Sequence, residues 1–162
     1  MNKSVNILGD EIIFDCLGCD CANHKIIPPG GYVYEDDFIY VAADYEVPIP
    51  GFMIIGINKH YSSLNQMTKQ ERIKVIETLN KTVQIVKDVC SVKDVVIIQE
   101  EKSNHFHIWV LPNYDWLIKF GKGSYGIKEK FEYAKSRGNL ENINDCLEKT
   151  KKIREKFLCN KF

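Results

Sequence analysis

Three short runs of β-branched and aromatic residues, separated by turn sequences, place the strongest constraint on how this chain folds. They cover residues 32–35, 38–42 and 52–57, and the segments between them include Asp-Asp at 36–37 and a proline- and glycine-rich stretch at 48–51. Runs of this composition are typical of strands, and strands that follow one another through short turns pair antiparallel. The sequence therefore predicts a small antiparallel meander.

One long helix is predicted to follow the meander. Thr68 and Glu71 form a capping box, and the apolar residues after them recur at the period of an amphipathic helix that ends near Cys90. The apolar positions are Ile73, Ile76, Leu79, Val83 and Val86. Two further strands are expected at 95–99 and 105–111.

The last of these strands follows a polar turn at 101–104 and ends at Pro112. Because side chains alternate along a strand, its residues divide between two faces. One face carries His105, His107, Trp109 and Leu111, and the other carries Phe106, Ile108 and Val110. We expect the long helix to cover the apolar second face, and the two imidazoles to share the first.

The two ends of the chain are predicted to contain no strands. The first 30 residues hold a cysteine-rich segment at 16–21 and a turn-forming segment at 28–31, so we expect a knuckle and a loop there without regular structure. From Ile127 onward the sequence is rich in lysine and glutamate, with apolar residues at helical spacing. It predicts two helices split at 137–139.

Length and composition narrow the class of protein. With 162 residues and no internal repeat or linker, the chain fits one α+β domain, made of residues 1–120 and a helical C-terminal extension, 121–162. The 22 basic residues are balanced by 22 acidic ones, so we expect no nucleic-acid partner. No apolar run has the length of a membrane span or the position of a signal peptide, so we expect a cytoplasmic protein without a membrane partner.

The cysteines and histidines carry the chemistry that the sequence suggests. Six cysteines in a reducing compartment favour metal ligation over disulfides. Cys16 and Cys19 have the spacing at which two thiolates from one turn reach a single ion, although the same spacing also suits a buried or redox-active thiol pair. A lone strand histidine is more often structural, but the pair His105 and His107 follows a polar turn and shares one face.

In order and spacing, several segments of the chain resemble the histidine triad (HIT) family. They are Pro29-Gly30-Gly31, Tyr34-Glu35-Asp36-Asp37, Asp44, Pro50-Gly51, Asn58-Lys59-His60-Tyr61 and His105-Phe106-His107-Ile108-Trp109-Val110-Leu111-Pro112. The last segment is similar to the family's motif of histidines alternating with apolar residues. The resemblance spans residues 16–112 and implies an antiparallel sheet of about five strands with packed helices, here followed by a helical C-terminal tail.

The resemblance also implies a function. It points to a nucleotide hydrolase or nucleotidyltransferase that acts at the α-phosphate of a dinucleotide polyphosphate, a nucleotide sugar or a nucleoside phosphoramidate. His107, the middle histidine of the motif, would be the catalytic nucleophile and form a nucleotidyl-histidine. Zinc-bearing relatives imply a structural zinc ion in a closed tetrahedral shell. Its ligands would be Cys16, Cys19, His60 and His105.

Four further residues are implied to bind the substrate. Asp44 would accept hydrogen bonds from the ribose hydroxyls, and Ser103 and Asn104 would hold the α-phosphate; all three also fit ordinary turn residues. Trp109 stands where the family has its third histidine, and an indole cannot shuttle a proton. The alternative reading is therefore a zinc-stabilised nucleotide-binding module without turnover, in which Trp109 packs the pocket wall.

Three smaller expectations follow from the same comparison. Relatives often carry an arginine after the motif, and here Lys119 and Lys122 are the candidates to replace it. Cys21 lies close enough in sequence to compete with Cys19 for an ion. The family commonly forms homodimers through a helix and a sheet edge, and the C-terminal tail is an alternative cover for such an edge.

Overall fold

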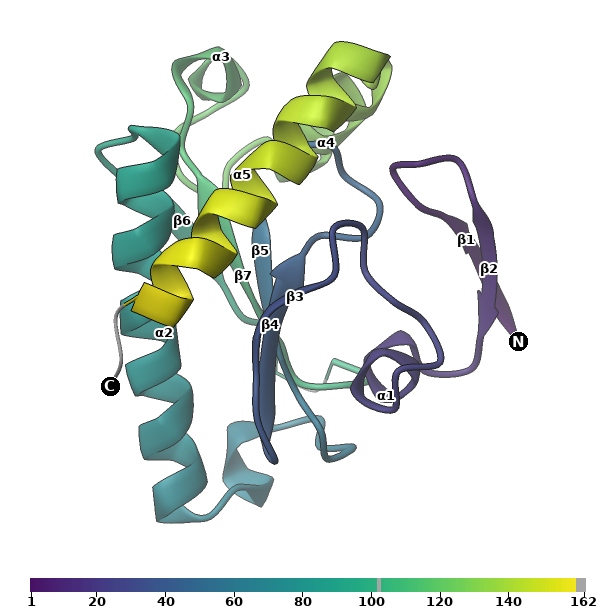
Figure 1. Ribbon diagram of the computed structural model, residues 1–162, viewed down its shortest axis with the longest axis vertical. Coiled ribbons are helices and arrows are strands. Elements are labelled where there is room, and N and C mark those ends of the chain that lie inside the picture. Colours follow the sequence, from purple (N-terminus) through teal and green to yellow (C-terminus); the bar gives the residue numbers. More distant parts are fainter. Residues whose placement is uncertain (102, 160–162) are drawn as a thin grey trace.

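Five antiparallel strands, in the order β3-β4-β5-β7-β6, form the central sheet (Figure 1). The strands are β3 (Tyr32–Glu35), β4 (Ile39–Ala43), β5 (Met53–Ile57), β6 (Val95–Ile98) and β7 (His107–Pro112). The computed structural model describes residues 1–101 and 103–159; Lys102 of the expected turn and residues 160–162 of the expected extension lie outside the described residues. The α+β fold with a five-stranded antiparallel sheet is as predicted from the sequence.

The start of the last strand differs most from the prediction, and the other strand ends agree to within one residue. The last strand begins at His107 and not at His105, because the pairing of β5 with β7 ends where Gly56 meets His107. The next carbonyl of that edge, that of Ile57, accepts a hydrogen bond from the His105 ring at 2.8 Å. His105 therefore lies in a bend before the strand, and its side chain replaces a backbone group at the end of the ladder.

Helix α2 (Lys69–Cys90) covers one face of the sheet. Its capping box forms as predicted, with the Thr68 hydroxyl accepting from the Glu71 backbone N–H at 3.2 Å and the Glu71 carboxylate accepting from that of Thr68 at 2.7 Å. The face beneath α2 carries the apolar residues expected there. They are Phe106, Ile108 and Val110, packed in one core cluster with Val75, Ile85 and Val86 of the helix.

The buried stripe of α2 lies on a different set of residues from the one predicted. Ile73 and Ile76 are exposed, whereas Thr78 and Thr82 are buried. Threonine can occupy the interior of a helix when its hydroxyl bonds back to the preceding turn, and the Thr82 hydroxyl donates to the Thr78 carbonyl at 2.7 Å. The apolar pattern alone therefore assigned the stripe wrongly at the start of the helix.

The first 22 residues contain regular elements, which corrects the expectation of a knuckle and loop without regular structure, whereas residues 23–31 form the expected loop. Strands β1 (Asn2–Val5) and β2 (Glu11–Phe14) form a separate hairpin, and α1 (Leu17–Ala22) follows it. The hairpin turn is stabilised by the Asn6 side chain, whose oxygen accepts from the backbone N–H groups of Leu8 and Asp10. Figure 1 shows the hairpin standing beside the main sheet, on the side of α1.

The C-terminal extension is helical, as expected, and packs on the core. It contains α4 (Ile127–Ser136) and α5 (Leu140–Cys159). Two short helices lie earlier in the chain, η1 (Leu64–Gln66) before α2 and α3 (Asp115–Ile118) after β7. Ile153 and Phe157 of α5 belong to the same core cluster as α2, and Arg154 donates to the Tyr32 carbonyl on the edge strand β3 at 2.8 Å. Within the described residues, none of the helices has the length and apolar content needed to cross a bilayer.

We predict that α5 is part of the cooperative unit formed by the sheet. Ile153 is 0% exposed, so Ile153→Ala should lower the free energy of unfolding by about 2–5 kcal/mol through lost burial and a cavity. Leu158→Ala, at a 70% exposed position of the same helix, should change it by less than about 0.5 kcal/mol. Urea denaturation followed by near-UV and far-UV signals checks this, and equal effects of the two changes would contradict it.

Candidate active site and metal cluster

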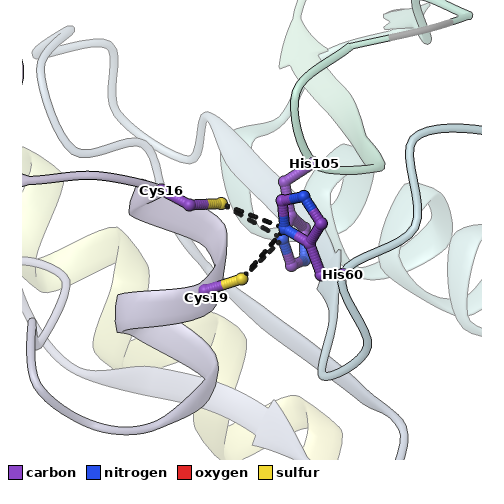
Figure 2. Close-up of side chains that lie close together, drawn as sticks. All are labelled: Cys16, Cys19, His60 and His105. Atoms are coloured by element: carbon purple, nitrogen blue, oxygen red, sulfur yellow. Dashed lines mark hydrogen bonds between the residues drawn. The ribbon is translucent and has the colours of Figure 1, made fainter.

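Four side chains from distant parts of the chain meet beside the sheet. Cys16 lies immediately before α1, Cys19 lies within it, His60 follows β5, and His105 precedes β7. Their ligand atoms all lie within 4.8 Å of one another. Figure 2 shows both sulfur atoms facing the two imidazole rings. The structure thus brings together the four residues named from the sequence, and they can hold a metal ion.

The distances within the cluster fit a tetrahedral ion. The Cys16 sulfur lies 3.5 Å from Nδ1 of both His60 and His105, and the Cys19 sulfur lies 3.1 Å and 3.5 Å from the same two atoms. In a tetrahedral zinc site with ordinary bond lengths, a sulfur and a nitrogen ligand are roughly 3.5 Å apart. These four sulfur–nitrogen distances are therefore compatible with two thiolates and two imidazoles around one zinc-sized ion.

The protonation of the ligands is also suitable. The Ile57 carbonyl only accepts hydrogen bonds, so Nε2 of His105 carries the proton and Nδ1 presents a lone pair to the thiols. Burial lowers the pKa of His105, which favours this neutral ring. Burial, followed by the neighbouring Cys16, raises the pKa of Cys19 to about 11, so binding of an ion would displace a thiol proton.

Gly18 is a functional position that the sequence analysis missed. It lies between the two cysteine ligands, and a Cβ atom placed on it would lie 2.4 Å from Cγ of His105. Only a glycine lets α1 approach the ring this closely. The signal was present in the sequence as the glycine inside the Cys-x-x-Cys segment, but nothing there indicated which side chain would lie against it.

Cys21 does not belong to the cluster. It is buried and packs with Tyr40 and Ala42, and burial raises the pKa of its thiol to about 12. Its position on α1 turns it toward the sheet, away from the four ligand atoms. The expectation that it competes with Cys19 is therefore wrong.

A cavity of about 520 Å³ lies next to the cluster, on the face of the sheet opposite α2. It contains most of the residues named from the sequence as substrate-binding or catalytic. They are Asp44, Asn104, His107 and Trp109. Ser103 is not among its lining residues, and the Ser103 hydroxyl donates to the His105 carbonyl at 3.0 Å.

His107 is oriented by the backbone of the metal cluster. Its Nδ1 lies 2.8 Å from the carbonyl oxygen of His105, and because a carbonyl only accepts, Nδ1 carries the proton. The lone pair is then on Nε2, the other ring nitrogen, in a half-buried side chain that lines the cavity. This tautomer leaves Nε2 free to attack an electrophile.

Asp44 follows β4, and one of its two carboxylate oxygens makes a structural contact. One carboxylate oxygen, Oδ1, accepts from the backbone N–H groups of Glu46 and Val47 at 2.9 Å and 2.7 Å. Burial raises the pKa of Asp44 to about 6, although these two hydrogen bonds oppose the shift. Asp44 therefore stabilises a turn and also lines the cavity, so its position is compatible with both interpretations made from the sequence.

The wall beyond His107 is aromatic. The Trp109 ring lies 5.9 Å from that of His107, 5.4 Å from Phe131 of α4 and 6.0 Å from Phe52, measured between ring centroids. Trp109 and Phe131 both line the cavity. Phe131 comes from the part of the C-terminal extension after Ile127, in which the sequence analysis identified no functional residue.

The lysine that reaches the cavity is not one of those expected. Lys119 and Lys122 are absent from the described lining residues, and the Lys119 ammonium lies 3.7 Å above the Tyr133 ring. Lys135 of α4 lines the cavity and lies 3.3 Å from the Glu46 carboxylate. The idea that Lys119 and Lys122 supply the cation is therefore wrong for this arrangement.

A family model described as HIT domain matches residues 28–116. The chain belongs to the HIT family. An uncharacterized HIT-like protein of Methanocaldococcus jannaschii is 26% identical in an alignment 115 residues long that covers 66% of this HIT chain and 88% of the relative. Residues 28–116, which the family model matches, contain His60, His105 and His107 but neither Cys16 nor Cys19.

Solved HIT structures share the fold at low sequence identity. A Zn-bound histidine triad family protein from Mycobacterium smegmatis has a TM-score of 0.63 at 10% identity, with 90% of this chain and 98% of that chain covered. A Hit-like protein involved in cell-cycle regulation from Bartonella henselae has a TM-score of 0.59 at 20% identity, with 88% and 96% covered. These likenesses extend the shared fold over most of the chain.

We predict that Gly18→Ala weakens metal binding. The added methyl group collides with the His105 ring, so α1 must move and carry Cys19 away from the other ligands. Changes beside metal ligands typically cost about 10–100-fold in affinity. Competition with a chromophoric chelator measures the loss. Cys21→Ala, on the same helix but outside the cluster, is the control, and an unchanged affinity in Gly18→Ala would contradict the prediction.

Proposed function

We propose that this HIT protein is a nucleotide hydrolase or nucleotidyltransferase that acts at an α-phosphate through a nucleotidyl-His107 intermediate. The observation that carries the proposal is the hydrogen bond from Nδ1 of His107 to the His105 carbonyl. It leaves the nucleophilic lone pair on Nε2 of a side chain that lines a nucleotide-sized cavity. Membership of the HIT family supports nucleotides as the ligand class.

The proposed reaction has two displacements at one phosphorus atom. Nε2 of His107 forms a bond to the α-phosphorus as the bond to the leaving group breaks, and the departing atom takes a proton from water. Water or another acceptor then attacks the phosphorus, and the phosphorus–nitrogen bond breaks to release a nucleoside monophosphate or its transfer product. Neutral imidazole suits both steps because it attacks and leaves readily near neutral pH.

The surrounding residues receive roles that fit their positions. Asp44 has one oxygen engaged in its turn, so its second oxygen, Oδ2, is the proposed acceptor for the ribose hydroxyls. Asn104 is exposed at the cavity and is the proposed donor to the α-phosphate oxygens. The Ser103 hydroxyl faces the His105 carbonyl, so its proposed role is to hold the bend that carries Asn104.

We also propose that the ion of the cluster is zinc, held by Cys16, Cys19, His60 and His105. Two sulfur and two nitrogen ligands are typical of zinc, and a HIT protein of the same fold is described as Zn-bound. Bound there, the ion would be structural, because its four ligands close the shell. Ligation would also hold His105 in place, and the backbone carbonyl of His105 orients the His107 ring.

Two properties of the whole molecule complete the proposal. Zinc ligation by thiolates and the free state of the other cysteines suit a reducing compartment, so we place the protein in the cytoplasm. For a homodimer we propose the β6 edge, because it is the sheet edge opposite β3 and carries the exposed Ile97.

A second function is favoured by one observation. Trp109 replaces a proton-carrying histidine with an indole packed against Phe131 and Phe52. Such a wall suits binding without turnover, so a zinc-stabilised nucleotide-binding module is the alternative. A covalent nucleotidyl-His107 intermediate is expected of the enzyme and not of the binding module, so its detection distinguishes the two functions.

We predict that the nucleophile can be trapped. Incubation with nucleotide substrates labelled at the α-phosphate, followed by a quench in base, should leave acid-labile label on the chain. His107→Ala should abolish the label because the attacking nitrogen is gone. Trp109→Ala should retain part of it, since the indole forms no bond to phosphorus. Label that persists in His107→Ala would refute the mechanism, and no label with any nucleotide of the panel would favour the binding module.

We predict that nucleotide affinity depends on the ionisation of Asp44. Its pKa is raised to about 6 in the free protein, and ribose hydroxyls donate to the ionised form, so affinity should rise as the pH rises through 6. At pH 5 about one carboxyl in ten is ionised, which gives a loss of up to about tenfold relative to pH 7.

The measurement uses the His107→Ala background, which removes turnover. The ligand for calorimetry is a nucleoside 5′-methylphosphate, whose diester does not titrate in this range. Adding Asp44→Asn should flatten the profile, because the amide keeps an oxygen for the turn but does not ionise. If affinity changed with pH to the same extent with and without Asp44→Asn, Asp44 would be ruled out as the ribose acceptor.

A further inference from the structure

An ion pair lines the cavity of the candidate site. The Lys135 ammonium of α4 lies 3.3 Å from the Glu46 carboxylate, and both residues belong to the cavity lining. The two side chains are 50% and 40% exposed, so a ligand can reach them. An exposed ion pair of this kind contributes little to folding stability. The pair therefore presents two opposite charges to whatever occupies this part of the cavity.

The strand register places the pair on the Asp44 side of His107. His107 pairs with Gly56 of β5, and two residues farther along these strands Trp109 pairs with Ile54. The chain of β4 runs in the same direction past this level to Asp44, and Glu46 follows two residues later. A nucleotide with its phosphorus at His107 and its ribose at Asp44 thus directs its base toward Glu46.

Glu46 is held in place by its neighbours. Its backbone N–H donates to Oδ1 of Asp44 at 2.9 Å, so the proposed ribose acceptor and Glu46 share one turn. The Ser4 hydroxyl of the N-terminal hairpin donates to Oε1, and the Lys135 ammonium donates to Oε2. Each oxygen thus has one partner among the residues that the structure describes, and a carboxylate oxygen can accept two hydrogen bonds. Glu46 can therefore accept two more, one at each oxygen.

Lys135 reaches the cavity from the C-terminal extension. Phe131 and Lys135 are four residues apart on α4, so they lie on one face of that helix, and both line the cavity. This helix lies beyond residues 28–116, which the HIT family model matches. An ammonium has three donors, so one that pairs with Glu46 can also donate to a ligand.

We infer that Glu46 and Lys135 bind the edge of the base and select guanine. The inference rests on the proposed function and names the nucleoside of its substrate. Guanine has two adjacent N–H donors, at N1 and N2, and an acceptor beside them, O6. The two oxygens of one carboxylate can accept the two N–H bonds side by side, and an ammonium can donate to O6. Hydrogen bonds to charged groups are stronger than those between neutral groups.

The other bases lack this pattern of donors and acceptors. Adenine and cytosine each have an amino group next to a ring nitrogen that only accepts, so the second oxygen of Glu46 would face a lone pair. Uracil has a single N–H between two carbonyl groups. A polar group that loses water without gaining a partner weakens binding. Glu46 and Lys135 are therefore specificity-determining residues, and neither takes part in the bond changes at phosphorus.

The test compares the 5′-methylphosphates of guanosine, inosine and adenosine by calorimetry in the His107→Ala background. Inosine keeps O6 and the N1–H of guanosine but has no amino group at N2. We expect guanosine to bind about tenfold or more tightly than inosine, because inosine loses one hydrogen bond to a charged acceptor. Adenosine should also bind at least about tenfold more weakly than guanosine.

Variants of the two residues should act differently. Glu46→Gln keeps one oxygen but turns the other position into a donor, so the guanosine-to-inosine ratio of affinities should fall at least about fivefold toward unity. Lys135→Met should weaken both ligands alike and leave this ratio unchanged, because both carry O6. A general loss of structure cancels in the ratio.

The same helix supplies matched controls. Lys128 and Glu132 of α4 form an exposed ion pair outside the described cavity lining. Lys128→Met and Glu132→Gln make the same two chemical changes as the test variants. They should alter neither the affinity for guanosine nor the ratio, since they lie away from the base.

The outcomes separate the inference from the function on which it rests. Equal binding of guanosine and inosine, or a ratio that does not respond to Glu46→Gln, would overturn guanine selection while His107 labelling still supported the reaction. Failure of the guanosine compound to bind would also overturn the inference. It would overturn the reaction only together with an absence of His107-dependent labelling.

Discussion

The residue on which the site depends is His105, because it makes three different contacts at once. Nε2 of its ring donates to the Ile57 carbonyl at the end of β5, Nδ1 faces the two thiols, and its backbone carbonyl accepts from His107. These contacts depend on one another. The hydrogen bond to Ile57 selects the His105 tautomer that can ligate an ion. The bend of the chain at His105 allows this bond and also places the His105 carbonyl next to the His107 ring. The arrangement requires glycine at position 18, because a Cβ atom there would collide with the His105 ring.

Much of the fold was predictable from local signals. The strands and α2 follow from β-branched runs, short turns and a capping box, all of which act within a few residues. The N-terminal hairpin was not predictable in this way, because β1 is mostly polar and its turn depends on the Asn6 side chain. The buried stripe of α2 was misassigned at Ile73 and Ile76, since burial there depends on where α5 and the sheet meet the helix.

The residues of the candidate site also differ in whether the sequence could predict them. The four residues of the cluster and His107 belong to spaced motifs, and the resemblance to a known family named them in advance. Phe131 and Lys135 have no such motif, because a helix far along the chain reaches the cavity only through tertiary packing. Lys119 and Lys122 were expected from their distance in sequence to the motif, but contact with the Tyr133 ring holds the Lys119 ammonium outside the cavity.

The packing of α5 against β3 makes the two edges of the sheet unequal. Arg154 donates to the carbonyl groups of Tyr32 and Gly30 at the β3 end, whereas β6 forms the other edge. A sheet with two open edges can add strands without end, as fibres do. Because α5 bonds to the start of β3, the β6 side is the edge less covered by the C-terminal helix. Two copies that paired through β6 about a two-fold axis would use both β6 edges and close the sheet at those edges.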